Sequence, residues 1–328
     1  MLREPRARSQ LRLRHAGLLS IIPLLLFLFL TSGYNSGQPP AVRNGSDARI
    51  ENTVVVPSYH EAENIPVLVT RIFEAVESPD ATEVVVVDDN SQDGTDDAVE
   101  KLKDEGYNVV LITRVGENGL SSAVLRGFKE ARGDKFVVMD ADLQHPPEYV
   151  PELFKALTER TPFVMGTRYG PGGGVDKDWP LLRRIISAGA RSLARPLTST
   201  SDPMSGFFGL TKDLYSQAAS VNPVGFKIAL ELLLKTHVPD EGVAEVSYAF
   251  AKRTAGASKL SSKTIIKYVF HLAALYRWSM GFFGLVLFEL LLVAACWLAL
   301  YAADAGALWL KQRRRADYRR KDKGRLDV

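Results

Sequence analysis

Hydrophobic and polar positions between residues 50 and 145 alternate in blocks. Short runs of continuously apolar, largely β-branched residues are separated by longer stretches with apolar residues at helical spacing. Runs that are apolar throughout indicate strands buried on both faces, as in a parallel sheet covered by helices. The pattern predicts strands at 53–57, 83–89, 108–114 and 135–142, separated by helices over 62–77, 94–104 and 119–132.

Polar motifs follow three of these predicted strands. They are ProSerTyrHisGlu at 57–61, AspAspAsnSer at 88–91 and AspAlaAspLeuGln at 140–144. The carboxyl ends of parallel strands meet at one edge of a sheet, and ligands of such folds bind in the crevice beyond that edge. We therefore expect the three motifs to surround one crevice.

The third motif has the chemistry of a divalent-cation site. Asp140 and Asp142 alternate on the predicted strand, so one should face the crevice and the other should lie against the chain end. Two carboxylates with the amide oxygen of Gln144 suit Mg²⁺ or Mn²⁺. Such a cation would bridge and neutralise a nucleotide diphosphate, which makes the diphosphate a better leaving group.

The other two motifs suit a nucleoside. Asp89 and Glu61 can accept hydrogen bonds from a base or ribose, and Tyr59 can stack on a ring. Neither GxxxxGK[ST] nor GxGxxG occurs, which argues against P-loop ATPases and dinucleotide dehydrogenases. An isolated DxD is usually a turn or a helix cap. Here it ends an apolar strand and is joined by two further acidic strand ends, which favours a binding site.

The C-terminal region predicts membrane association. Residues 281–302 are apolar apart from Glu289, and a helix of that length spans about 33 Å, enough for a bilayer core. Basic residues follow at 311–315, as charge often follows a span. Upstream, 259–278 places apolar residues and lysines at helical spacing. This pattern suits a helix in the headgroup layer or, equally, a helix packed on the globular domain.

The N-terminal region has two interpretations. Residues 16–30 form a short apolar stretch after an Arg-rich leader, typical of a signal-peptide core or of a short anchor. A polar Gly/Pro/Ser linker follows at 33–49 and contains the sequon at Asn44.

The charge distribution excludes some classes of protein. The 328 residues are 46% hydrophobic and carry a net charge of +3, so the chain is not of a disordered type. Residues 1–15 carry +4 and residues 311–328 carry +6, which leaves −7 for the middle of the chain. An acidic folded region disfavours a nucleic-acid-binding protein. The single cysteine, Cys296, excludes an intrachain disulfide and a cysteine-based zinc site.

Several longer motifs together resemble family 2 glycosyltransferases of the GT-A fold. More narrowly, the motifs resemble the dolichol-phosphate mannose synthases of the fungal single-chain type, which have a C-terminal membrane anchor. The similarity covers residues 50–280, and the N-terminal 48 residues and the basic tail fall outside it. The motifs are VVPSYHEAENI, VVDDNSQDGT, GLSSAVLRGF, MDADLQHPPE, GTRYGPGGGVDKDWPLLRRIIS, SDPMSGFFGL, GFKIALELL and RTAGASKL.

The resemblance implies an α/β fold: a Rossmann-like GT-A domain with a mostly parallel sheet, interfacial helices and a C-terminal transmembrane helix. The implied segments are a leader, hydrophobic segment and linker (1–48), the GT-A domain (49–260), an amphipathic interfacial helix (261–280), a transmembrane helix (281–303) and a basic tail (304–328).

The resemblance also implies an activity. It is transfer of mannose from GDP-mannose to dolichyl phosphate with inversion, giving GDP and dolichyl β-D-mannosyl phosphate. That product is the mannosyl donor for N-glycosylation, O-mannosylation and GPI-anchor synthesis. The implied partners are these two substrates and the lipid bilayer, with small membrane subunits as further candidates.

Site residues are implied position by position. The guanosine would contact Pro57, Tyr59, Glu61, Val87 and Asp89. The diphosphate and the metal would contact Asp140, Ala141, Asp142 and Gln144. Donor and acceptor phosphates would meet Arg168, Arg253 and Lys259, and the lipid phosphate would meet Arg183 and Ser187. Asp142 and Arg168 are the candidate catalytic residues. Convergent cations near a membrane suit a lipid phosphate, because arginine binds phosphate in a bidentate manner.

Three alternatives stand beside this hypothesis. The first is the same fold acting on UDP-glucose and dolichyl phosphate. The second is a processive polysaccharide synthase, but its Gln-x-x-Arg-Trp motif is incomplete, since Ala274 precedes Arg277 and Trp278. The third is a non-enzymatic membrane subunit, which would not need a complete acidic crevice.

Topology gives conflicting expectations. Both basic ends favour the cytosolic side of a membrane. If residues 16–30 cross the membrane with the Arg-rich leader in the cytosol, the domain between this segment and residues 281–302 faces the lumen. The nucleotide-sugar donor that the resemblance implies is, however, cytosolic. We follow the resemblance and expect the endoplasmic reticulum membrane with the catalytic domain on its cytosolic face. Glycosylation at Asn44 would indicate the opposite orientation.

Overall fold

The computed structural model describes residues 49–174, 181–221, 227–251 and 262–326. These residues fall into two compact units, one ending at Leu275 and one beginning at Tyr276, and each unit is considered by itself.

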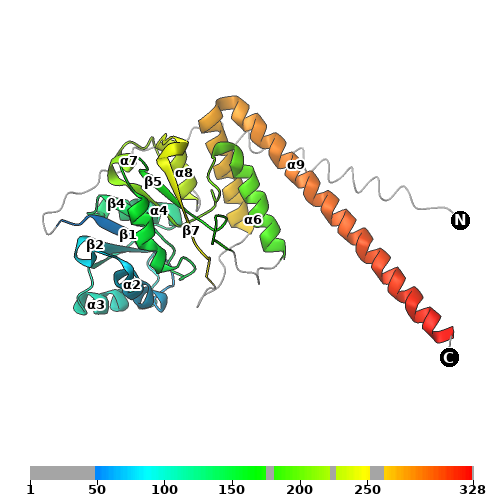
Figure 1. Ribbon diagram of the computed structural model, residues 1–328, viewed down its shortest axis with the longest axis horizontal. Helices are drawn as coiled ribbons and strands as arrows, with labels where there is room; N and C mark the ends of the chain where they lie inside the picture. The colour runs from blue at the N-terminus through cyan, green and yellow to red at the C-terminus, as the bar shows by residue number, and fades with distance from the viewer. Residues whose placement is uncertain (1–48, 175–180, 222–226, 252–261, 327–328) are drawn as a thin grey trace. The chain divides into compact units, whose positions relative to one another are not determined.

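The first unit is built on a seven-stranded sheet of order β3-β2-β1-β4-β6-β5-β7 (Figure 1). Its strands are β1 (Asn52–Ser58), β2 (Thr82–Asp88), β3 (Val109–Thr113), β4 (Lys135–Val138), β5 (Phe163–Thr167), β6 (Phe208–Thr211) and β7 (Val243–Ser247). Strand β1 pairs in parallel with β2 and β4, β2 with β3, and β5 with β7. Strand β6 runs antiparallel between β4 and β5. The expected α/β architecture with a mostly parallel sheet is confirmed.

Helices cover both faces of this sheet. The helices of the first unit before residue 252 are α2 (Asn64–Ala75), α3 (Thr95–Asp104), α4 (Leu120–Glu130), α5 (Val150–Ala156), α6 (Leu181–Ala194), α7 (Lys212–Ser216) and α8 (Ile228–Lys235), with short 3₁₀ turns between them. Apolar residues of α2, α3 and α5 form one buried cluster with the sheet, and those of α4, α7 and α8 form the other. The fold therefore has three layers, helices on sheet on helices.

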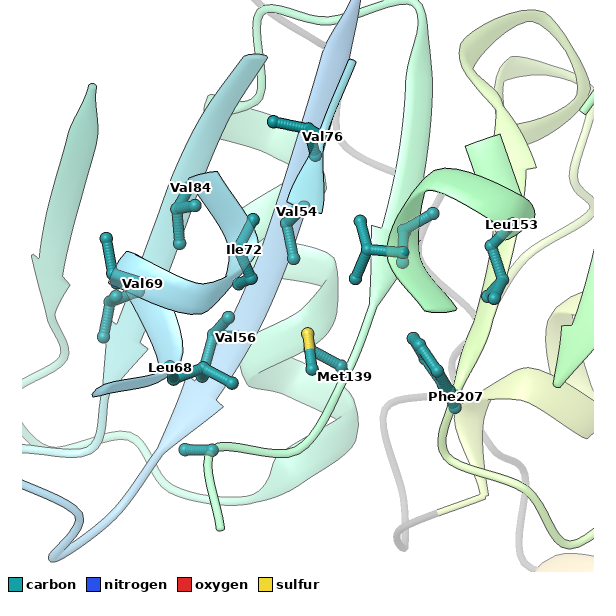
Figure 2. Packing of buried hydrophobic residues seen from close by; sticks show 14 of the residues in the cluster. Val54, Val56, Leu68, Val69, Ile72, Val76, Val84, Met139, Leu153 and Phe207 are labelled. Atoms are coloured by element: carbon teal, nitrogen blue, oxygen red, sulfur yellow. The ribbon is translucent and has the colours of Figure 1, made fainter. Parts of the chain in front are cut away.

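Alternation along β1 divides the core between the two faces. Val54 and Val56 belong to the cluster under α2, whereas Val55 belongs to the cluster under α4. Figure 2 shows the first cluster, in which Leu68, Val69 and Ile72 of α2 lie over β1 and β2. Burial on both faces explains why these strands are apolar throughout in the sequence.

The predicted elements between residues 52 and 138 are confirmed, with ends shifted by one to a few residues. One expectation is wrong. The strand predicted at 135–142 ends at Val138, so Asp140 and Asp142 do not alternate on a strand. They lie instead in a turn, where Leu143 has a left-handed φ of 62° and the Gln144 amide donates to the Asp142 carboxylate.

The C-terminal helix α9 (Ser262–Leu326) contains one break, at Gly281, where φ is 64° and ψ is −146°. A positive φ of this kind is readily adopted by glycine. The break coincides with the predicted boundary between the interfacial helix (261–280) and the membrane span (281–303). Residues Thr264–Leu298 form a helix long and apolar enough to cross a membrane, with a mean hydropathy of 2.2 in its most apolar window.

The first turns of α9 are amphipathic. Tyr268, His271 and Leu272 are buried within the first unit, whereas Ile265 and Ile266 on the same turns are exposed. Packing on the globular domain, one of the two interpretations of this segment, is therefore confirmed. The exposed apolar residues leave a second face for a headgroup layer.

Two helix-interior glycines provide a test of this packing. A Cβ atom at Gly127 in α4 would lie 2.3 Å from Cγ1 of Val55, whereas a Cβ atom at Gly189 in α6 would meet nothing within 4 Å. We expect Gly127→Ala to lower the free energy of unfolding by about 1–3 kcal/mol through overpacking. Gly189→Ala should raise it by up to about 1 kcal/mol, because alanine favours helix. Unfolding measured in detergent would check both, and equal effects of the two substitutions would contradict the packing described.

Candidate active site

Three loops meet at the carboxyl edge of the sheet. In-register parallel pairing aligns Ser58 with Asp88, and Val55 with Val138, so β1, β2 and β4 end along the same edge. The motifs at 57–61, 88–91 and 140–144 therefore follow neighbouring strand ends, as predicted. Each loop also contains a non-glycine residue with positive φ, namely His60, Asn90 and Leu143. Such conformations are unfavourable for most residues and persist only where surrounding contacts maintain them. They cluster at functional sites.

Pro57 fits this edge for a structural reason. The Val55 carbonyl accepts a hydrogen bond from Met139, and the Ser58 carbonyl accepts one from Asp89 of the β2 side. Backbone N–H and C=O groups alternate in direction along a strand, so those of Val55 and Pro57 point toward β4 and those of Ser58 point toward β2. Strand β4 ends at Val138, opposite Val55, so no β4 residue is left to pair with Pro57. A residue without an N–H costs no ladder bond there.

The first loop presents one exposed ring and one buried carboxylate. Tyr59 is 46% exposed, so part of its ring is accessible for stacking on a ligand. Glu61 is buried and accepts a hydrogen bond from the Asn64 amide at 2.7 Å. Val87 is fully buried in β2, so its contribution to a ligand site would be through packing and backbone.

Asp88, which was not among the predicted site residues, organises the same loop. Its buried carboxylate accepts from the Ser91 amide at 2.8 Å and from the Ser91 hydroxyl at 2.6 Å. The Ser91 hydroxyl in turn accepts from the His60 amide at 2.8 Å. The ends of β1 and β2 are therefore joined by a continuous hydrogen-bonded chain.

Asp89 is held by an arginine that sequence reasoning missed. The Arg114 guanidinium donates to Oδ1 of Asp89 through both Nε and Nη2, and the Gly119 amide donates to Oδ2 at 2.8 Å. Arg114 also donates to the Ser122 hydroxyl at 2.8 Å and to the Gly119 carbonyl at 3.0 Å. Its side chain is only 2% exposed. A forked, charge-assisted contact of this kind fixes the carboxylate in orientation.

The third loop is held by a buried histidine. Nδ1 of His145 accepts a hydrogen bond from the Asp140 amide at 3.0 Å, and its ring stacks on Phe207. Burial lowers the pKa of His145 to about 3, against the opposing effect of Asp142. A neutral imidazole is required for this acceptor role, so His145 acts by positioning Asp140.

The predicted metal ligands lie together in this turn. The Asp140 side chain is 37% exposed, whereas Asp142 and Gln144 are buried. The Gln144 side-chain amide donates to the Ala251 carbonyl at 3.4 Å. Among the described residues, no group of three or more His, Cys, Asp or Glu side chains is arranged to hold a metal. Two carboxylates and an amide oxygen fit a cation whose coordination is completed by phosphate oxygens and water.

Arg168, which follows β5, has a buried partner. It donates from Nε and Nη2 to the Asp202 carboxylate at 2.7 and 2.9 Å, and Asp202 is fully buried. Burial disfavours the charged guanidinium, but the hydrogen bonds and charge of Asp202 outweigh it and raise the pKa of Arg168. The guanidinium also lies over the rings of Tyr169 and Phe250. Arg168 therefore remains a fixed cation.

Lys227 is a second cation of the site that sequence reasoning missed. It stands at the start of α8, and its ammonium donates to the Met204 carbonyl. Burial lowers the pKa of Lys227 to about 8; Arg168 lowers it further, and Asp140 and Asp202 oppose the shift. The available signal was a lysine directly before an apolar helix, in GFKIALELL.

Helix α6 carries Arg183 and Ser187 one turn apart, both half-buried. Farther along it, the Arg191 guanidinium lies 3.9 Å from the centroid of the Tyr169 ring. Because Tyr169 follows Arg168, this contact joins α6 to the end of β5. Of the predicted phosphate-binding residues, Arg253 and Lys259 lie outside the described residues.

The Arg114 network leads to a prediction for nucleotide binding. Arg114→Lys removes the forked contact to Asp89, and losing a hydrogen bond to a charged group costs about 1.5–3 kcal/mol. We expect GDP to bind at least about 10-fold more weakly, as measured by isothermal titration calorimetry of the full chain.

Arg71→Lys is the matched control. Arg71 makes a similar fork, to Glu148, with both hydrogen bonds at 2.8 Å, but on the exposed surface of α2. Equal GDP affinity of the two variants would contradict a role for Arg114 at the nucleoside end of the site.

Comparison with known proteins places this geometry in a family. Residues 53–217 match the model of glycosyl transferase family 2. A dolichol-phosphate mannosyltransferase of Mycosarcoma maydis is 52% identical over 255 residues, which cover 76% of this chain and 86% of the relative. Its namesake from Saccharomyces cerevisiae is 53% identical over 246 residues, covering 73% and 92%. The namesake from Pyrococcus furiosus is 42% identical over 262 residues, covering 79% and 71%.

Solved structures agree in fold. Glucosyl-3-phosphoglycerate synthase of Mycobacterium tuberculosis, in complex with Mn²⁺, UDP and glucosyl-3-phosphoglycerate, superposes with a TM-score of 0.54 at 21% identity, covering 71% of this chain and 80% of that one. The sheet, the strand-end motifs and the extent of the sequence identity lead to one assignment: the chain belongs to glycosyl transferase family 2, in the group formed by its dolichol-phosphate mannosyltransferase relatives.

Proposed function

We propose that the chain transfers mannose from GDP-mannose to dolichyl phosphate, giving dolichyl β-D-mannosyl phosphate and GDP. The observation that carries the proposal is identity of 52–53% to two enzymes of that name over most of this chain. The geometry supports it, because acidic strand ends suited to a nucleotide sugar lie in the same unit as basic residues on α6. The UDP-glucose alternative is not favoured, since these relatives are mannosyltransferases by name.

The reaction is a single displacement at the anomeric carbon of mannose. An oxygen of the acceptor phosphate forms a bond to this carbon as the bond to the GDP oxygen breaks, which inverts the configuration from α to β. A phosphate monoester is already largely ionised near neutral pH, because its second pKa is about 6. The chain therefore needs no strong general base, and its residues contribute by positioning and by stabilising charge.

The residues divide this work by location. Tyr59 and Glu61 would hold the guanosine together with Asp89, whose carboxylate is fixed by Arg114. Arg168 would stabilise phosphate charge, and it is fixed in position by Asp202. On α6, Arg183 and Ser187 would bind the acceptor phosphate, and Arg253 and Lys259 are proposed for the same phosphates from sequence alone.

A divalent cation is proposed for the turn at 140–144. Asp140, Asp142 and Gln144 would hold Mg²⁺ or Mn²⁺, which when bound neutralises the diphosphate and so assists departure of GDP. The His145 ring keeps the backbone of Asp140 in place, and Gln144 ties the same turn to Ala251.

We place the protein in the endoplasmic reticulum membrane with the first unit on the cytosolic side. The C-terminal apolar helix is compatible with a membrane anchor, and the exposed fraction of Phe283 on it is 85%. The cytosolic face rests on the proposed donor, since nucleotide sugars of this kind are expected there. Basic residues at the ends of the chain could meet anionic headgroups.

The donor and the need for partner subunits can be tested together. Full-length chain purified in detergent would be given dolichyl phosphate, Mg²⁺ or Mn²⁺, and either GDP-mannose or UDP-glucose. We expect kcat/KM for GDP-mannose to exceed that for UDP-glucose by about 100-fold or more, because a site with fixed polar groups rejects a mismatched base. Equal or better use of UDP-glucose would contradict the proposed donor. No transfer by the purified chain would favour a subunit of a larger enzyme.

A further inference from the structure

The first turns of α9 contact the candidate site through a residue that the proposed function does not use. Tyr268 is only 5% exposed, although it belongs to a helix whose neighbouring residues Ile265 and Ile266 face outward. Its hydroxyl donates to the Ala190 carbonyl at 2.8 Å and lies 3.4 Å from the Met204 sulfur. A buried tyrosine hydroxyl with two such neighbours fixes the elements that they belong to.

The first of these elements is α6. Arg183, Ser187 and Ala190 follow one another at i, i+4 and i+7, so they lie along one stripe of the helix. Tyr268 therefore contacts α6 on the stripe that carries the two proposed acceptor-phosphate residues. In Figure 1 the first part of α9 lies alongside α6, in agreement with this contact.

The second element is the loop that holds the fixed cations. Met204 follows Asp202, whose carboxylate is forked by Arg168. The Met204 carbonyl accepts from the Lys227 ammonium, and the Ser205 amide donates to the Asp202 carbonyl at 3.1 Å. Tyr268 thus contacts both α6, which carries the proposed acceptor-phosphate residues, and the loop that positions Arg168.

A second contact holds α9 to the same region. His271, one turn after Tyr268, lies 2.9 Å from the carboxylate of Glu231 on α8, and Lys235 contacts that carboxylate as well. Burial raises the pKa of Glu231, but the contacts with His271 and Lys235 outweigh it and lower the pKa overall. Helix α8 begins directly after Lys227. The start of α9 is therefore joined to the helix that follows Lys227 as well as to the loop that contacts Arg168.

We propose that Tyr268 is a positioning residue for the acceptor: it holds α6 against the Asp202–Met204 loop so that Arg183, Ser187 and Arg168 face one phosphate. This inference rests on the proposed function, in which α6 binds the lipid phosphate. The first turns of α9 are then part of the acceptor site as well as a connection to the membrane helix.

Tyr268→Phe tests the proposal in the full chain with the least disturbance of packing. Because it removes only the hydroxyl, we expect kcat/KM for dolichyl phosphate to fall about 10-fold, while the KM for GDP-mannose stays unchanged. Tyr215→Phe is the matched control, since the buried Tyr215 hydroxyl makes no hydrogen bond with any residue that the structure describes. Thermal unfolding of both variants would be measured alongside the kinetics.

Three results would overturn the inference. They are unchanged acceptor kinetics in Tyr268→Phe, an equal loss with both substrates, or a loss matched by Tyr215→Phe. Arg183→Gln separates this inference from the proposed function. If Arg183→Gln impairs use of dolichyl phosphate and Tyr268→Phe does not, only the role of Tyr268 fails. If Arg183→Gln has no effect, the acceptor site on α6 fails, and the inference fails with it.

Discussion

The parallel pairing of β1 with β2 on one side and β4 on the other is the constraint on which the site depends. Pairing without a register shift makes all three strands end at one edge. The loops that follow then lie at the same edge of the sheet, which brings Glu61 and Asp142 to one end of the fold although 81 positions separate them in the chain. A slip of one residue in any pair would exchange side chains between the two helix-covered faces of the sheet, so the packing of the core also fixes how the strand ends are aligned.

Buried charge is the second constraint, and the fold meets it by pairing. Asp89 has Arg114, Asp202 has Arg168, and Glu231 has His271 and Lys235. Removing one member of such a pair leaves a buried charge without compensation, which costs far more than the pair contributes. Each pair therefore fixes one element in position: the start of α4, the end of β5 and the first turns of α9.

Sequence patterns predicted the layers and the shared edge at which the three motifs follow their strands, because both depend on local periodicity. The continuous apolar runs identified the first strands, and acidic residues after those runs identified Asp89, Asp140 and Asp142. The pattern did not reveal Arg114 or Lys227, since a cation whose partner lies 25 or 23 residues away leaves no periodic trace in the sequence. It also extended β4 into a turn, because apolar Met139 and Ala141 alternate with the two aspartates as strand positions would, whereas the structure ends the strand at Val138. The turn itself is formed by the left-handed φ of Leu143 and the hydrogen bond from Gln144 to Asp142, neither of which the pattern reveals.

The central claim is that the turn after β4 holds the diphosphate of the donor together with a divalent cation. Asp142→Ala tests it most directly, with mannosyl transfer to dolichyl phosphate measured at saturating GDP-mannose and metal, and with thermal unfolding measured to establish that the variant folds. The account predicts a folded protein without detectable transfer. Turnover near that of the unsubstituted chain would contradict the assignment of this turn.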